Sequence, residues 1–279
     1  MCRRCPLVAV LLCALSALPA TNSEAPQVAF SILVTNSDGV RAPGLAAIVR
    51  ALRGVGPITV VAPDQDQTGT GHSVSFAEPI YSTTVTLADG TVATALSATP
   101  ASCVKVAFDA PLVRRPPDLV VSGVNRGYSL GLGTYASGAI GAVREAALRG
   151  IPAIAISIAS SADPHYEAAA DIAARLASQV RVRGLERGAF LNVNVPPGTL
   201  DTLRDVRLTA QSTQAGTERF EEQAGSDGRR YFWSISQGPR RDVEGTDVWA
   251  VSQGFVSVTP LRIGEFDPVT FQKWKSLKW

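Results

Sequence analysis

Cysteine is scarce in this chain outside its first residues. Three of the four cysteines are Cys2, Cys5 and Cys13, and Cys103 stands alone in the rest of the sequence. A lone cysteine excludes both an internal disulfide and a cysteine-based zinc site in residues 21–279. Because apolar residues surround Cys103, we expect a packed core thiol there and not a nucleophile.

An excess of charge is also missing once the first residues are set aside. The whole chain has 26 Lys and Arg against 24 Asp and Glu, and Arg3 and Arg4 are the charged residues of positions 1–20. Residues 21–279 therefore carry no net charge. Without a basic excess, the sequence gives no indication that the protein binds a nucleic-acid polymer. Low-complexity segments and internal repeats are absent too, which favours an ordinary globular fold.

A long apolar run is present near the start and is too short to cross a membrane. It covers residues 7–18, follows Arg3 and Arg4, and leads into the small-residue site Leu18-Pro19-Ala20. This order is typical of a secretory signal peptide, whereas a membrane-spanning helix needs roughly 20 apolar residues. We therefore expect a signal peptide over residues 1–20, a mature chain that begins near Thr21, and no stable membrane anchor. The expected location is periplasmic or secreted.

Strands and helices alternate along the rest of the chain. Unbroken apolar runs predict buried strands at residues 29–35, 58–61, 119–121, 153–158 and 190–193. Apolar residues at helical spacing predict helices after Pro43 and over residues 138–148 and 165–180. Short buried strands between amphipathic helices are typical of a parallel sheet covered on both faces. We predict one α/β domain over residues 21–279, with a doubly wound, mostly parallel sheet.

β-Rich insertions and a C-terminal extension interrupt this alternation. Residues 80–96, broken by Asp89-Gly90, predict a β-hairpin. Residues 211–242 are polar, contain one predicted strand at 230–236, and suggest an excursion used in oligomerisation. The extension, residues 266–279, is expected to pack on the core or on a neighbouring subunit, because it carries Phe271, Trp274 and Trp279.

Small polar residues and glycines follow three of the predicted strands. They are Asn36-Ser37-Asp38-Gly39, residues 64–73, and residues 122–127, which lead on to Ser137-Gly138. Ligands of doubly wound sheets bind beyond the carboxyl ends of the strands. A carboxylate, several hydroxyls and an Asn amide suit Mg²⁺ or Mn²⁺, and a helix that opens at Ser137-Gly138 suits a phosphate. Each segment alone is typical of a turn, but three at one sheet edge predict a site.

These segments, taken in order, resemble the SurE survival-protein nucleotidases over nearly all of residues 21–279. The matching motifs are residues 32–40, 42–44, 61–64, 68–73, 99–104, 117–125, 150–157, 192–196, 245–247 and 254–261. The resemblance implies a Rossmann-like core and a divalent-metal phosphomonoesterase that acts on nucleoside 5′- or 3′-monophosphates. It also implies a homodimer or homotetramer in which the hairpin and the C-terminal segment are exchanged between subunits.

The resemblance also implies which residues form the site. The metal ligands that it implies are Ser37, Asp38, Thr68 and Asn125. The phosphate would contact Ser137-Gly138, with Asn125 as a further substrate-binding residue. Asp38 and the neighbouring Asn36 are the candidate catalytic residues.

Departures from the family pattern define the main alternative. Ser37 stands where the family has the first of two adjacent aspartates, and a neutral hydroxyl is a weaker ligand than a carboxylate. Thr68 replaces a Ser and keeps the oxygen, whereas Ala139-Ile140 replaces Thr-Val and removes one phosphate donor. Ser102 replaces an Asp at a helix start, where it can still cap the helix. A catalytically weakened nucleotide- or phosphate-binding protein of the same fold is therefore the second candidate.

Two further enzyme classes match short motifs only. Gly127-Tyr128-Ser129-Leu130-Gly131 fits the serine-hydrolase pattern G-x-S-x-G, but that elbow requires a helix directly after the Ser. Gly131-Leu132-Gly133-Thr134 follows here and is poor helix sequence. A dinucleotide site is disfavoured because position 136 is Ala where the third glycine is required, and because these glycines do not follow the first strand.

Overall fold

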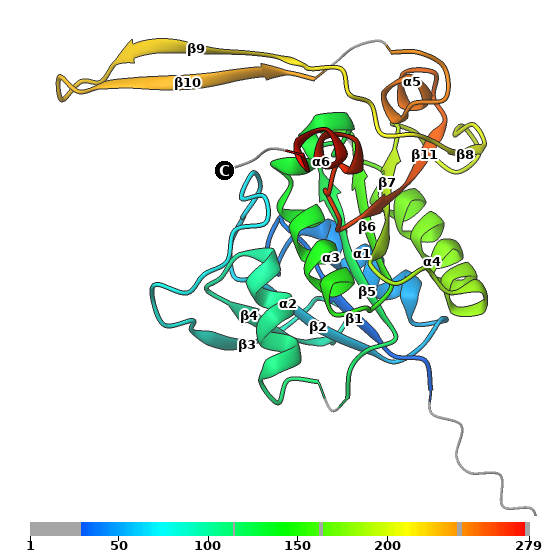
Figure 1. Ribbon diagram of the computed structural model, residues 1–279. Helices are drawn as coiled ribbons and strands as arrows, with labels where there is room; N and C mark the ends of the chain where they lie inside the picture. Colours follow the sequence, from blue (N-terminus) through cyan, green and yellow to red (C-terminus); the bar gives the residue numbers. More distant parts are fainter. Residues whose placement is uncertain (1–28, 114, 162–163, 239–241, 277–279) are drawn as a thin grey trace, which may run out of the picture.

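A mostly parallel sheet lies at the centre of the structure, with helices on both faces (Figure 1). This computed structural model describes residues 29–113, 115–161, 164–238 and 242–276. The predicted signal peptide, residues 1–20, lies outside the described residues. In the described ranges we find no helix that is long and apolar enough to cross a membrane.

Nine strands of the described residues form this sheet, in the order β3-β4-β2-β1-β5-β6-β7-β11-β8. The strands from β4 to β7 in this order are parallel, and antiparallel pairs flank them at β3–β4 and β7–β11. The strands are β1 (Ile32–Thr35), β2 (Ile58–Pro63), β3 (Ser82–Thr86), β4 (Val92–Leu96), β5 (Leu119–Arg126), β6 (Ala153–Ile158), β7 (Ala189–Val195), β8 (Val206–Leu208) and β11 (Val256–Arg262).

Four helices bury the two faces of the sheet. They are α1 (Pro43–Leu52), α2 (Pro100–Asp109), α3 (Gly138–Leu148) and α4 (Tyr166–Arg183). The apolar faces of α1 and α4 share one core with one side of the sheet, and α2 and α3 share a second core with the other side (Figure 1). The predicted α/β class with a doubly wound, mostly parallel sheet is confirmed.

The crossovers on either side of β6 have opposite hands. The chain steps in the same direction across the sheet from β5 to β6 and from β6 to β7. The connecting helices α3 and α4 nevertheless lie on opposite faces. One of these two crossovers is therefore left-handed, which is rare for β-α-β units. The alanines of α4 that are buried against the α1 face, Ala169, Ala170, Ala173 and Ala177, allow close helix packing there.

Local sequence signals place several boundaries correctly. Helix α1 begins at Pro43, whose ring fixes a helical φ in the first turn. Helix α3 and strand β6 match their predicted ranges. Gly150, which follows α3, has a φ of 75°, a conformation that glycine adopts without strain. Cys103 is buried and free, as predicted.

Two predictions near the site need correction. Strand β5 runs on to Arg126 instead of ending at residue 121, because the ladder with β6 resumes at Asn125 after an irregularity. Helix α2 is capped by Thr99, whose side chain accepts the backbone N–H of Ser102. Ser102 lies within the first turn, and its hydroxyl instead accepts the backbone N–H of Ser75 at 2.7 Å.

Both insertions are β-hairpins, and the second contains a strand that was not predicted. The predicted hairpin at residues 80–96 is β3–β4. A second hairpin pairs β10 (Arg230–Gln237) with β9 (Thr217–Ala224) and projects from the body (Figure 1). Strand β9 was not predicted, because every residue in it is exposed and the run TERFEEQA has no apolar face.

The described part of the C-terminal extension, residues 266–276, has no residue buried against the core. Helix α6 (Pro268–Trp274) has no buried residue, and Phe266 is 69% exposed. Phe266 and Phe271 pack edge-on against each other, with ring centroids 5.3 Å apart. Trp274 is 59% exposed and Trp279 lies outside the described residues. Packing on the chain's own core is thus wrong for the described part, while packing on a second subunit stays a prediction.

Candidate functional site

The predicted site residues gather where the winding direction of the sheet changes. Strand β1 lies between β2 and β5, so the helices that follow β1 and β5 lead away on opposite faces. Ser37 and Asp38 follow β1, and Asn125 lies at the carboxyl end of β5. Crevices at such switch points are where open α/β sheets bind ligands.

Hydrogen bonds join the ends of these two strands. The Asn125 side-chain oxygen accepts the Ser37 backbone N–H at 2.8 Å and the Ser37 hydroxyl at 3.1 Å. The Ser37 hydroxyl also lies 3.1 Å from one Asp38 carboxylate oxygen, and the other carboxylate oxygen accepts the Arg126 backbone N–H at 2.7 Å. The three predicted ligands from β1 and β5 therefore form one connected cluster.

Burial makes the Asp38 carboxylate unusual. Burial raises the pKa of Asp38 above its ordinary value, and the nearby Asp66 carboxylate raises it further. The hydrogen bonds from Arg126 and Ser37 oppose this effect without overcoming it. A partly desolvated carboxylate that is held by neutral donors gains from a cation beside it.

Two hydrogen bonds to backbone carbonyls fix the orientation of the Asn125 side chain. Its amide N–H₂ donates to the backbone carbonyls of Ser122 at 3.1 Å and Ile156 at 2.9 Å, and the residue is 2% exposed. Both amide protons are thus used, which fixes the side-chain oxygen toward Ser37. If the Ser37 hydroxyl donates to Asp38 instead, one lone pair of this oxygen is left for another partner.

A cavity of about 180 Å³ lies over this cluster. It collects residues from the three predicted segments. The residues that line it are Ser37, Thr68, Gly69, Asn125, Arg126, Gly127, Tyr128, Ser129, Gly133, Ala136, Ser137 and Gly138. The structure therefore brings the predicted metal ligands and the predicted phosphate contacts to one place, with Asp38 joined to them through Ser37 and Arg126.

Asn36 and Asp38 are the predicted site residues that do not line the cavity, and Asn36 is also not hydrogen-bonded to the lining residues Ser37 and Asn125. Asn36 is fully buried, and its amide donates to the Gly39 carbonyl at 2.9 Å, which closes the turn after β1. Its side-chain oxygen has no hydrogen-bond partner among the described residues. The structure thus gives Asn36 a place in shaping the turn that presents Asp38, and direct contact with a substrate stays a prediction.

The start of α3 also lines the cavity, through Ser137 and Gly138. Ser137 caps the helix by accepting the Ile140 backbone N–H at 3.3 Å. A Cβ atom at Gly138 would lie 2.8 Å from the Gln67 carbonyl oxygen and 2.9 Å from the Thr70 hydroxyl. Glycine at this position therefore lets the Thr68 loop approach the helix start, where backbone N–H groups suit a phosphate.

Ser129 is a residue of the site that sequence reasoning assigned only to the disfavoured hydrolase elbow. Its hydroxyl is buried and donates to the Ser137 hydroxyl oxygen at 2.8 Å. Its backbone N–H donates to the Asn194 side chain, and its carbonyl accepts from Asn192 and Asn194. Because Ser137 accepts from both Ser129 and Ile140, its own proton remains for a bound anion.

Asp247 holds the segment between β5 and α3, a function that was not predicted from the sequence. It is 0% exposed and begins helix α5 (Asp247–Ser252). One carboxylate oxygen accepts the backbone N–H of Gly131 at 2.8 Å, and the other accepts those of Ser212 and Val248 at 2.9 Å each. Gly131 begins η1 (Gly131–Tyr135), the 3₁₀ turn that leads to Ser137.

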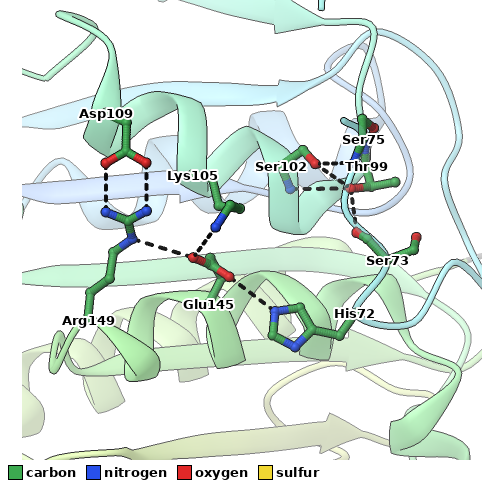
Figure 2. A network of polar contacts seen from close by, with 9 residues as sticks. All are labelled: His72, Ser73, Ser75, Thr99, Ser102, Lys105, Asp109, Glu145 and Arg149. Carbon is green, nitrogen blue, oxygen red and sulfur yellow. Dashed lines mark hydrogen bonds and ion pairs between the residues drawn. The ribbon is translucent and has the colours of Figure 1, made fainter. Parts of the chain in front are cut away.

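A network of charged residues joins the loop of residues 64–73, which contains Thr68, to helices α2 and α3 (Figure 2). Glu145 on α3 is buried and lies 3.2 Å from His72, which ends this loop, and 3.4 Å from both Lys105 and Arg149. Burial raises the pKa of Glu145, but the His72 hydrogen bond and the Lys105 charge outweigh it and the pKa falls below its ordinary value. An ionised Glu145 thus ties the loop to the helix that carries Ser137.

The donor set fits a hard divalent cation. The described residues contain no cluster of three or more His, Cys, Asp and Glu side chains, so a cation at this site would meet few charged ligands. Instead, one carboxylate from Asp38 lies with the neutral oxygens of Asn125 and Ser37, and Thr68 lines the same cavity. Oxygen ligands with few charges suit a cation that keeps several of its waters, as Mg²⁺ does.

Comparisons with known proteins agree with this geometry. The family model "Survival protein SurE" matches residues 32–218. The chain is 43% identical over 235 residues to the "5'-nucleotidase SurE" of Geobacter sulfurreducens, covering 84% of this chain and 88% of that protein. It is 40% identical to the "5'-nucleotidase SurE" of Geotalea daltonii, covering 83% and 92%.

A solved structure shows the same fold. The crystal structure of the SurE protein from Aquifex aeolicus superposes with a TM-score of 0.77 at 32% sequence identity, covering 88% of this chain and 98% of that one. The family model covers most of the described core, and the relatives match over most of both chains. This chain therefore belongs to the SurE survival-protein family.

Proposed function

We propose that this protein is a metal-dependent phosphomonoesterase that hydrolyses nucleoside 5′- or 3′-monophosphates to nucleoside and phosphate. One observation carries the proposal: oxygen-bearing residues from two strand ends and the Thr68 loop line one cavity of about 180 Å³ together with Ser137 and Gly138 at the start of α3. The Asp38 carboxylate is joined to this lining by its hydrogen bond with the Ser37 hydroxyl. The names of the SurE relatives, which describe 5′-nucleotidases, support the reaction class.

Each side of the cavity has its own task in this proposal. Asp38, Asn125, Ser37 and Thr68 would hold Mg²⁺ or Mn²⁺, which when bound supplies positive charge for the phosphoryl oxygens and lowers the pKa of water. Ser137 and the first N–H groups of α3 would bind the phosphoryl oxygens. The Arg126 guanidinium, whose residue lines the cavity, adds positive charge close to them.

The second candidate is a catalytically weakened protein that binds nucleotide or phosphate. The observation that favours it is the Ser37 hydroxyl, which stands beside Asp38 and Asn125 where a second carboxylate would add charge. With one carboxylate, the affinity for the cation falls, while the anion-binding start of α3 is unaffected.

Phosphate release from a panel of nucleoside monophosphates distinguishes these candidates. We expect release with Mn²⁺ or Mg²⁺ and loss of release when EDTA removes the cation. A protein that binds the nucleotide but releases no phosphate with any divalent cation would be the weakened form.

The variant Ser37→Asp tests the ligand assignment in the same assay. A second carboxylate beside Asp38 repels the first, so the metal-free variant should melt at a lower temperature than the parent. Mn²⁺ should reverse this loss and bind more tightly than to the parent, with phosphatase activity at least equal. If the parent is active and Ser37→Asp is inactive, Ser37 is an adapted ligand and our ligand assignment is wrong.

We also propose that the protein is a homodimer or homotetramer built through the β9–β10 hairpin and the C-terminal segment. Exposed aromatic side chains on both segments support this proposal. Phe220 and Trp233 on the hairpin are 64% and 61% exposed, and Phe271 in the C-terminal segment is 50% exposed. Exposed aromatic clusters usually mark contact surfaces. Sedimentation equilibrium should give at least twice the chain mass, and a monomer at micromolar concentration would contradict this.

Export is the remaining part of the proposal. It rests on the order of charged flank, apolar run and small-residue exit in residues 1–20. Mass spectrometry of the protein from its native source should find an N-terminus at or near Thr21. A full-length product as the main species would exclude a cleaved signal peptide.

A further inference from the structure

The loop of residues 64–73 lies along one face of helix α3. Gly138 and Gly141 are three positions apart and so share this face of the helix. A Cβ atom at Gly138 would lie 2.8 Å from the Gln67 carbonyl oxygen. A Cβ atom at Gly141 would overlap the Gly71 carbonyl oxygen. The two glycines therefore let the backbone of the loop lie directly against the helix.

Glu145 holds the end of this loop on the same face. It follows Gly141 by four positions, and one of its carboxylate oxygens lies 3.2 Å from His72 Nε2 (Figure 2). The other oxygen lies 3.4 Å from both Lys105 Nζ and Arg149 Nε. Because an ionised carboxylate only accepts hydrogen bonds, His72 Nε2 is the donor. One oxygen of Glu145 thus holds the loop, and the other joins α2 and α3.

Thr68 lies between two anchored parts of the loop. Before it, the Gln67 backbone N–H donates to the Ser37 carbonyl at 2.7 Å. After it, the Gly71 backbone N–H donates to the Ala136 carbonyl at 2.9 Å. Thr68 itself is an exposed residue that lines the cavity. The position of its hydroxyl at the cavity is therefore set by the anchors on either side of it.

We propose that His72 and Glu145 are positioning residues for the cation site, which fix the loop against α3 and thereby hold Thr68 at the cavity. The inference rests on the proposed function and adds two residues that act through Thr68. A neutral oxygen ligand contributes only when it is held at coordination distance, about 2.0–2.6 Å from the cation. Loss of the contact between His72 and Glu145 would free one end of the loop and weaken this ligand.

The variant His72→Ala tests this positioning in the full-length protein. The His72 side chain is already 24% exposed, so the fold should tolerate its removal. We expect the Kd for Mn²⁺, measured by titration calorimetry on the metal-free protein, to rise about tenfold. Hydrogen exchange of the backbone amides of residues 67–73 should become about tenfold faster. The variant His72→Gln keeps an N–H donor for Glu145 and should restore most of both values.

The matched control is Asp109→Asn, at the other end of the same network. Asp109 lies on α2, and its carboxylate accepts two hydrogen bonds from the Arg149 guanidinium, at 2.8 Å and 2.7 Å. The control weakens the contact between α2 and α3 and leaves the His72 contact in place, so both measurements should match the parent. If Asp109→Asn weakens Mn²⁺ binding as much as His72→Ala does, the network only supports the helix pair and the proposal is wrong.

Phosphate release separates this inference from the proposed function. Equal Mn²⁺ affinity in the parent and His72→Ala, with phosphate release by both, would overturn the positioning and leave the nucleotidase. Mn²⁺ binding without phosphate release by the parent would overturn the catalytic proposal, while the comparison with His72→Ala still decides the positioning. A parent that binds no Mn²⁺ would contradict the cation site and this inference together.

Discussion

The metal-dependent phosphatase activity of the variant Asp38→Asn should be at least about a hundredfold lower than that of the parent. Replacing a residue that only supports a metal ligand already lowers metal affinity or activity by roughly 10- to 100-fold. Asp38 is the carboxylate of the proposed ligand set, and an amide cannot replace its charge. The loss should appear in kcat/KM at every Mn²⁺ concentration tested. A phosphate-release assay across a Mn²⁺ titration measures it.

The stability of the same variant separates a ligand from a structural residue. Burial holds the folded pKa of Asp38 above its unfolded value. The charged carboxylate therefore lowers stability at pH values above that unfolded pKa, and the penalty disappears as pH falls through the folded pKa. Asn carries no such penalty, although it accepts only one of the two hydrogen bonds from Arg126 and Ser37.

The metal-free Asp38→Asn protein should therefore melt close to the parent at pH 7. Added Mn²⁺ should raise the melting temperature of the parent and not that of the variant. The control is Asp171→Asn, an exposed carboxylate on α4, which should behave as the parent in both measurements. An Asp38→Asn protein that keeps its activity would exclude this cation site.

The variant Asp247→Asn should lower the free energy of unfolding by about 2–4 kcal/mol, since hydrogen bonds to a buried charged group are strong and a lost acceptor leaves donors unsatisfied. Asp247 accepts three backbone N–H groups, from Gly131, Ser212 and Val248, while 0% exposed. Asn presents one oxygen, and its amide N–H₂ must face at least one of these donors. Urea denaturation followed by circular dichroism measures the change.

The same variant should also weaken phosphate binding, because Gly131 begins the turn that leads to Ser137. The control is Asp205→Asn, an exposed carboxylate before β8, for which we expect less than about 0.5 kcal/mol. A loss below about 1 kcal/mol in Asp247→Asn would show that the three donors find other partners.

Local signals were enough to place most of the core elements. Helix α3 and strand β6 have their predicted bounds, because each depends on a short apolar pattern with glycine or proline at its ends. The predicted strand ended too early, at residue 121, because Ser122 and Gly123 are typical turn residues. Pairing with β1 and β6 continues the strand there, and no local pattern reports a neighbouring strand.

The β9–β10 hairpin also shows that a local sequence pattern does not report which strands pair. A strand was predicted at residues 230–236, within β10, which contains Tyr231, Phe232 and Trp233, whereas β9 is mostly charged or polar and exposed throughout. Strand β9 exists because β10 pairs with it along its whole length, from Arg230 with Ala224 to Gln237 with Thr217. Its backbone hydrogen bonds do not depend on an apolar face.

The sequence by itself determined the fold class, the order of the core elements and, through the family resemblance, the candidate metal ligands Asp38 and Asn125 and the candidate phosphate contact Ser137. Only the tertiary structure placed Asn36 behind the cavity and revealed how Asp247 supports the site. The physical reason is distance along the chain. Periodicity and turn chemistry act within a few residues, whereas Asp247 bonds to Gly131 across 116 positions, and such contacts form only when the whole sheet is assembled.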